Sequence, residues 1–168
     1  MNKILLIDGH SILNRAFYGV PPLTNFEGLH TNAVYGFINI MLKSLEDEHA
    51  DYIAVAFDLK APTFRHEMFA EYKGTRKPMP QELHEQVPVI KEVLAAMTIP
   101  VITLEGYEAD DILGTLAKRC QRDGFEVSIL SGDRDLLQLA DEHIKIRMPK
   151  TVKGQTSICL VYTSDAAD

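Results

Sequence analysis

Short apolar runs rich in β-branched residues alternate along this chain with longer segments in which apolar residues recur at helical spacing. Runs of the first kind predict buried strands, and segments of the second kind predict helices that pack on them. The expected strands cover residues 3–7, 52–57, 99–104, 126–130 and 144–147. Because such alternation is typical of α/β proteins, we expect a mainly parallel central sheet flanked by helices.

Three helices are expected between these strands, over residues 31–48, 80–97 and 107–122. The first two carry a continuous apolar stripe that would cover the sheet, and Gly124 provides a stop after the third. Residues 19–30 and 59–80 show neither periodicity, and their Pro, Gly and Asn content predicts loops. Loops of such length frequently carry function.

The size and composition of the chain fit one compact domain. It has 168 residues, of which 46% are apolar and 24% charged. No apolar run is long enough to span a bilayer, and the first strand leads into Asp8 instead of a small-residue cleavage site, so we expect neither a membrane partner nor a leader. Cys120 and Cys159 lack the spacing of a disulfide framework or zinc site, which favours a reducing cytoplasm.

The net charge of −7 argues at first against a nucleic-acid partner, but the charges are unevenly distributed. Residues 60–77 hold five basic and two acidic side chains, a local balance of +3 that leaves −10 for the remainder. These side chains are Lys60, Arg65, Lys73, Arg76, Lys77, Glu67 and Glu71. The chain therefore combines one basic segment with an acidic body.

Acidic residues follow the expected strands where each strand ends. They are Asp8, Asp58, Glu108, Asp110, Asp111, Asp133 and Asp135. In an open parallel sheet these strand ends share one edge, where ligands bind. Taken singly, Asp110 and Asp111 could complement a helix dipole, and Asp133 could form a surface ion pair. Seven carboxylates on one rim would repel one another unless divalent cations neutralised them, and an all-oxygen set suits Mg²⁺ or Mn²⁺, with two ions as in phosphodiester cleavage.

The basic segment would suit a nucleic-acid strand beside that rim. Tyr72 could stack on a base, while Lys73, Arg76 and Lys77 hold phosphates. Taken alone, the segment could equally be a solvated charged loop. Arg15 could contact a phosphate or pair with one of the carboxylates.

Four motifs together resemble a known family. They are LLIDGHSILNRAF, VAFDLKAPTFRHEMFAEYKGTRKPMP, GYEADDILGTLA and SGDRDLLQLA. In this order and spacing they are similar to the 5′-nuclease domains at the amino terminus of bacterial DNA polymerases I, over residues 1–155. The wider family includes flap endonucleases and phage 5′-exonucleases and has a PIN-like fold.

The resemblance implies hydrolysis of DNA or RNA primers at 5′ flaps or 5′ ends beside a duplex, in replication and repair, with polymerase domains in the full-length protein. It places such a protein in the bacterial cytoplasm, at the nucleoid. Asp110 looks best placed to touch both metal ions. The other matching ligands are Asp8, Asp58, Glu108, Asp133 and Asp135, with Asp111 matching less firmly across the family. Lys73 and Arg76 match an arch in which both approach the scissile phosphate as catalytic residues. The DNA-binding set is Arg15, Arg65, Tyr72, Lys73, Arg76 and Lys77.

The chain departs from the family at its carboxyl end. It stops before the helix-three-turn-helix segment that grips the duplex, and residues 159–168 do not look like the family. We therefore expect a nuclease core over residues 1–155 and a poorly packed, disordered or non-native tail over 156–168. Two other functions stay open: a noncatalytic module that binds DNA junctions, and a metal-dependent phosphatase for small phosphoesters.

Overall fold

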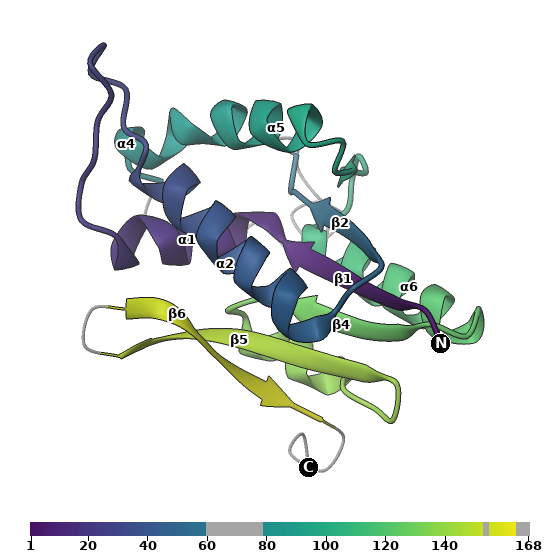
Figure 1. The fold of residues 1–168 in the computed structure, drawn as a ribbon. Helices are drawn as coiled ribbons and strands as arrows, with labels where there is room; N and C mark the ends of the chain where they lie inside the picture. Colours follow the sequence, from purple (N-terminus) through teal and green to yellow (C-terminus); the bar gives the residue numbers. More distant parts are fainter. Residues whose placement is uncertain (60–78, 153–154, 164–168) are drawn as a thin grey trace.

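A six-stranded sheet runs through the middle of the protein in the computed structural model, which describes residues 1–59, 79–152 and 155–163 (Figure 1). The strand order is β3-β2-β1-β4-β5-β6. The strands are β1 (Lys3–Asp8), β2 (Tyr52–Ala56), β3 (Val101–Ile102), β4 (Glu126–Leu130), β5 (Ile144–Val152) and β6 (Gln155–Tyr162). All pairs are parallel except the antiparallel β5–β6 pair. The expected α/β class with a mainly parallel sheet is confirmed.

Helices cover both faces of the sheet (Figure 1). They are α1 (Gly9–Gly19), α2 (Asn32–Glu48), α4 (Gln81–His84), α5 (Gln86–Ala96), α6 (Ala109–Arg122) and the 3₁₀ helix η1 (Arg134–Leu139). Alternate residues of β1 separate two cores: Leu5 and Ile7 pack with α1, α2 and α5, whereas Leu6 packs with α6 and η1. No helix among the described residues is long and apolar enough to cross a bilayer.

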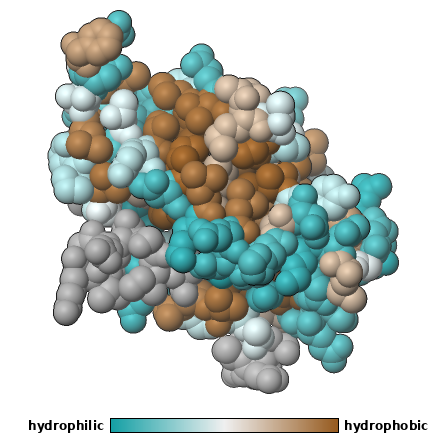
Figure 2. Space-filling model, viewed as in Figure 1, coloured by the Kyte–Doolittle hydropathy of each residue, from teal (hydrophilic) through white to brown (hydrophobic). Residues whose placement is uncertain are grey.

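The exposed surface of α2 and α5 is partly apolar. Figure 2 shows apolar side chains gathered in the upper part of the face where these helices lie in Figure 1, above a polar lower part. Tyr35 and Leu42 of α2 and Met97 after α5 are among the exposed large apolar residues. The loop expected over residues 19–30 is present, although Gly19 ends α1, and Phe26 within it is 98% exposed.

Several element boundaries differ from the sequence predictions. The strand expected over 99–104 is reduced to Val101–Ile102, and β5 extends past residue 147 to Val152. The helix expected over 80–97 is divided at Glu85 into α4 and α5. The sequence pattern gave no boundaries for α1 or η1.

Most of the described part of the expected tail, residues 156–162, belongs to a strand. Residues 155–162 form β6, whose backbone pairs with β5 and whose Tyr162 packs against the α6-side core. The β-branched and aromatic content of SICLVY explains the strand. Residues 164–168 lie outside the described part, and the domain boundary at residue 155 stays a prediction.

A buried ion network fastens α2 to β5. The Arg147 guanidinium donates to Glu48 Oε1 at 2.8 Å and to Asp47 Oδ2 at 3.1 Å, and the Lys145 ammonium lies 3.0 Å from Glu48 Oε2. Arg147 and Glu48 are nearly buried, with 6% of each side chain exposed. Burial raises the pKa of Glu48, but the hydrogen bonds from Lys145 and Arg147 outweigh it and lower that pKa overall. The buried charges of Arg147 and Glu48 are therefore stabilised by the ion pairs within this network.

Replacing Arg147 with Ala leaves Glu48 buried with Lys145 as its main cation, so we expect the free energy of unfolding to fall by about 3 kcal/mol. As a control, Lys118→Ala breaks an exposed pair with Asp141 and should cost less than about 1 kcal/mol. Urea unfolding followed by circular dichroism measures both. Equal losses for the two variants would contradict a special role for the buried network.

A second pair of variants tests the close crossing of α1 and α2. A β-carbon on Gly36 would lie 2.7 Å from Ala16 Cβ, so Gly36→Ala must push the helices apart and should cost about 1–2 kcal/mol. Gly114 in α6 has neighbours no nearer than 3.7 Å, so Gly114→Ala should gain roughly 0.5–1 kcal/mol from helix propensity. Thermal unfolding should show shifts of opposite sign, and a stabilised Gly36→Ala variant would refute the close packing.

Candidate functional site

The predicted carboxylates come from strand ends that meet at one edge of the sheet. Asp8 is the last residue of β1, Asp58 follows β2 by two residues, and Asp133 follows β4 by three. Strands β2 and β4 lie on either side of β1. The chain proceeds from β1 through β2 to β3 on one side and then places β4 on the other, so the topological switch point lies beside Asp8.

Two serines that sequence reasoning missed hold this edge together. The Ser131 hydroxyl donates to Asp8 Oδ2 at 2.8 Å and accepts from the Asp133 backbone N–H at 3.0 Å. Ser11 Oγ accepts from the Gly132 backbone N–H at 2.7 Å. Ser131 has no exposed surface, so its hydroxyl is a fixed part of the site. Its only sequence signal is its place directly after a buried strand, beside a Gly-Asp turn.

Four of the other predicted carboxylates, Asp58, Glu108, Asp111 and Asp133, accept hydrogen bonds from backbone N–H groups. Asp58 Oδ1 accepts from the Ala109 N–H and so connects the end of β2 to the start of α6. Glu108 and Asp111 form a capping box, in which Asp111 Oδ2 accepts from the Glu108 N–H at 3.1 Å. Asp133 Oδ1 accepts from the Asp135 N–H at 2.9 Å at the start of η1. The helix-start role that seemed an alternative for Asp111 is therefore real, and Asp133 caps η1.

Asp8 carries the electrostatic signature of the site. Its side chain is nearly buried, and this burial, more than any other cause, raises the pKa of Asp8 from 3.8 to about 6. The negative charges of Asp58 and Asp133 raise it further, while the hydrogen bond from Ser131 opposes the shift. The carboxylates that follow two neighbouring strands thus both act on Asp8.

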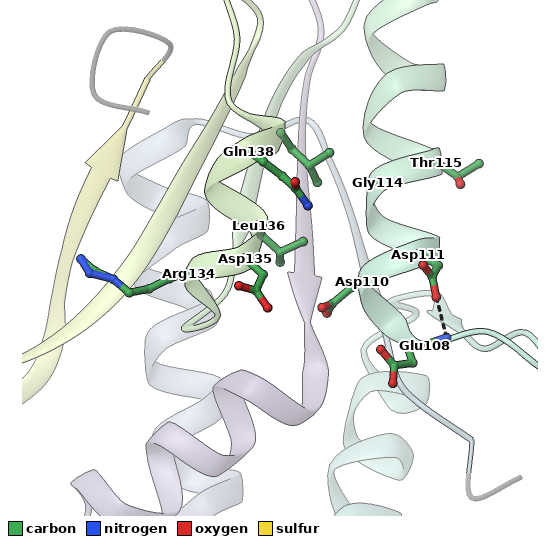
Figure 3. A pocket seen from close by; sticks show the side chains of 10 residues that line it. Glu108, Asp110, Asp111, Gly114, Thr115, Arg134, Asp135, Leu136 and Gln138 are labelled. Carbon is green, nitrogen blue, oxygen red and sulfur yellow. Dashed lines mark hydrogen bonds between the residues drawn. The ribbon is translucent and has the colours of Figure 1, made fainter. Parts of the chain in front are cut away.

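An open groove of about 720 Å³ continues the site between α6 and η1. Figure 3 shows the Asp110 and Asp135 side chains pointing toward one another across the space between these elements, while Arg134 points away. Glu108 and Asp111 line the same groove near the start of α6. The groove therefore has acidic groups on both walls.

These residues fit a hard divalent cation by the chemistry of their donors. All seven predicted ligands are carboxylates. A bound cation would offset the repulsion that Asp58 and Asp133 exert on the Asp8 carboxylate. Among residues 1–59, 79–152 and 155–163, however, no three His, Cys, Asp or Glu side chains approach closely enough to hold an ion. The structure thus brings the predicted ligands to one edge without closing a coordination shell.

Arg15 lies beside the same edge, because a β-carbon on Gly132 would be 3.7 Å from one of its guanidinium nitrogens. The other predicted DNA-binding and catalytic side chains fall outside the described residues, so their roles stay predictions. They are Arg65, Tyr72, Lys73, Arg76 and Lys77.

Comparisons with known proteins identify the family of the chain. Residues 3–165 match the family described as "5′-3′ exonuclease, N-terminal resolvase-like domain". The chain is 53% identical over 164 residues to DNA polymerase I of Bacillus caldotenax and 52% identical over 156 residues to that of Bacillus subtilis (strain 168). These matches cover 98% and 93% of this chain, but the chain spans only 18% of the length of either relative.

A solved structure of T5 5′-exonuclease with bound zinc shares the fold, with a TM-score of 0.66. It is 23% identical in sequence, and the match covers 86% of this chain and 54% of that one. The expected likeness to phage 5′-exonucleases in fold is confirmed.

The pKa of Asp8 predicts a pH-dependent stability. Because the folded pKa of about 6 exceeds the ordinary 3.8, the folded chain holds the proton more tightly, and stability is lost as pH rises between these values. Asp8→Asn removes this cost. In EDTA the variant should match the wild type near pH 3.5 and exceed it by about 3 kcal/mol at pH 7.

Urea unfolding across this pH range measures the difference. The exposed Asp123, replaced by Asn, serves as the control and should show no such trend. Added Mg²⁺ should raise the melting temperature of the wild type more than that of Asp8→Asn. A difference between wild type and Asp8→Asn that does not change with pH would contradict the raised pKa.

Proposed function

The chain belongs to the family of 5′-3′ exonuclease N-terminal resolvase-like domains, and on that premise we propose that it is a metal-dependent 5′-nuclease. Its substrate would be a DNA strand or RNA primer with a 5′ flap or 5′ end at a junction with duplex. The observation that carries the proposal is the convergence of Asp8, Asp58 and Asp133 at one sheet edge, with a raised pKa on the buried Asp8.

Two divalent ions, Mg²⁺ or Mn²⁺, would be held by the carboxylate set at this edge. The proposed ligands are Asp8, Asp58, Glu108, Asp110, Asp111, Asp133 and Asp135. Bound ions of this kind lower the pKa of a water and stabilise the leaving oxygen of a phosphodiester. Support comes from the groove between α6 and η1, where Asp110 and Asp135 point toward one another (Figure 3). Asp110 is the proposed catalytic carboxylate shared by both ions.

The protein's own groups would orient the reaction. Ser131 fixes the buried carboxylate of Asp8, so that little reorganisation is needed when charge develops. Arg15, beside Gly132, would bind a phosphate of the substrate strand. Lys73 and Arg76 are proposed to act on the scissile phosphate, with Arg65, Tyr72 and Lys77 holding the single strand.

The two rival functions are less well supported. A module that only binds DNA junctions would have no use for repelling carboxylates that destabilise the metal-free fold. A phosphatase for small phosphoesters is disfavoured by membership in an exonuclease family. As in the curated relatives, which are DNA polymerases I, we propose that further polymerase domains accompany this domain in a longer protein of the bacterial cytoplasm, associated with the nucleoid.

Cleavage of a labelled 5′-flap duplex in Mg²⁺ or Mn²⁺ tests the proposal. The wild type should cut the 5′ flap and leave a matching 3′ flap intact. Asp110→Ala should lower the rate by roughly 100-fold or more, since it removes stabilisation of the developing charge. Its melting temperature should stay at the wild-type value or rise, because one repelling charge is gone.

The matched control is Asp123→Ala, which removes an exposed carboxylate at the opposite end of the same helix. It should leave the cleavage rate unchanged. A folded wild type that binds the flap duplex without cutting it would replace the nuclease with the binding module. Full activity of Asp110→Ala would remove Asp110 from the site.

A further inference from the structure

Lys91, a residue of α5 that the sequence motifs did not single out, lies close to the acidic edge. Its ammonium is 5.2 Å from the centroid of the Phe57 ring. Phe57 is completely buried and directly precedes Asp58. The half-buried lysine is therefore held against the residue that positions one of the proposed ligands.

The Phe57 ring also touches the first residues after β1. A β-carbon on Gly9 would lie 2.6 Å from the ring, and the His10 ring packs edge-on against it with centroids 5.1 Å apart. His10 Nε2 faces the Asp58 carbonyl oxygen at 3.4 Å. The Phe57 ring thus contacts both Lys91 and the residues that follow Asp8, and it belongs to the residue that precedes Asp58.

The electrostatics of His10 agree with this proximity. Burial is the main cause that lowers the pKa of His10; the Asp58 charge raises it, and the Lys91 charge lowers it again. Lys91 and Asp58 therefore act on the same buried group from nearby positions.

The surroundings of Lys91 orient its charge without neutralising it. A lysine on open surface has four rotatable bonds and a strongly hydrated ammonium, whereas a cation over an aromatic face is attracted to the ring. Within residues 1–59, 79–152 and 155–163, no carboxylate lies within the 4 Å of an ion pair with Lys91. Such a cation is suited to an anionic ligand that arrives from solution.

Lys91 and Arg15 flank the carboxylates from opposite sides. Lys91 is associated with the end of β2 through Phe57, and Arg15 with the turn after β4 through Gly132. Strand β1, which ends at Asp8, lies between these two strands in the sheet. A polyanion crossing the edge would meet a positive charge on each side of the acidic centre.

We propose that Lys91 binds a phosphate of the substrate strand on the Asp58 side of the site. This inference rests on the proposed nuclease function, since it takes nucleic acid as the ligand. It adds a fixed cation from α5, on the opposite side of Asp8 from Arg15.

The test is the salt dependence of binding. Fluorescence anisotropy would measure binding of a labelled 5′-flap duplex between 50 and 200 mM KCl, with Ca²⁺ as the divalent ion. Loss of one phosphate contact should reduce the slope of log K against log[salt] by about 0.7–0.9 in Lys91→Ala and weaken binding several-fold. Lys91→Arg, which keeps the charge, should retain the wild-type slope.

Lys43→Ala is the matched control, because Lys43 lies on α2 in an exposed pair with Asp47. Its slope should equal that of the wild type. A Lys91→Ala slope equal to that of the wild type would overturn the phosphate contact, and so would a Lys91→Arg slope as low as that of Lys91→Ala. Melting temperatures show whether each variant is folded.

The same samples separate this inference from the function on which it rests. Wild-type cleavage of the 5′ flap, combined with an unchanged slope for Lys91→Ala, overturns only the role of Lys91. A wild type that neither binds nor cuts the flap duplex overturns both.

Discussion

The parallel pairing of β1 with both β2 and β4 is the constraint on which the rest of the structure depends. Leu5 is opposite Ile53 on one side and Ser128 on the other, and helices cover both faces. Because both edges and both faces of β1 are covered, this strand can carry charged side chains only at its two ends. The packing that buries Leu5, Leu6 and Ile7 therefore brings Asp8 into an edge where burial, and to a smaller extent the charges of neighbouring carboxylates, raise its pKa. The packed sheet supplies the stability that is lost by burying the Asp8 charge beside other carboxylates, a trade-off common at functional sites.

Structural and functional roles coincide in several of these carboxylates. Asp58, Asp111 and Asp133 each accept a backbone N–H, which could suggest that they are only caps and turns. A carboxylate has two oxygens and about four acceptor positions, so one hydrogen bond leaves capacity for another ligand. The backbone contacts restrict the rotation of each side chain and so fix the direction in which its remaining lone pairs point. Capping is therefore a means of preorganising the edge and does not compete with a functional role.

The sequence was sufficient to predict the class of fold, the five parallel strands and the acidic edge, because all three follow from the spacing of apolar residues and the residue after each strand. The hydrogen bond from Ser131 to Asp8 could not be predicted from the sequence, because the two residues are 123 positions apart and serines carry no periodic signal. Lys91 was missed for a similar reason: its significance comes from the Phe57 ring. β6 was missed because the end of the chain was judged by family likeness, although its residues favour a strand.

The distance along the chain between β1 and β4 has a consequence for how the protein is made. At a synthesis rate of about 5–20 residues per second, β1 waits roughly 6–25 s before β4 has emerged to pair with it. Until then one edge of β1 is unpaired and its apolar residues are incompletely covered. Asp8 at the end of β1 and Asp133 after β4 cannot meet during this interval, so the acidic edge is completed late in folding. A pause in translation before residue 126 would lengthen the period in which the nascent chain needs protection from aggregation.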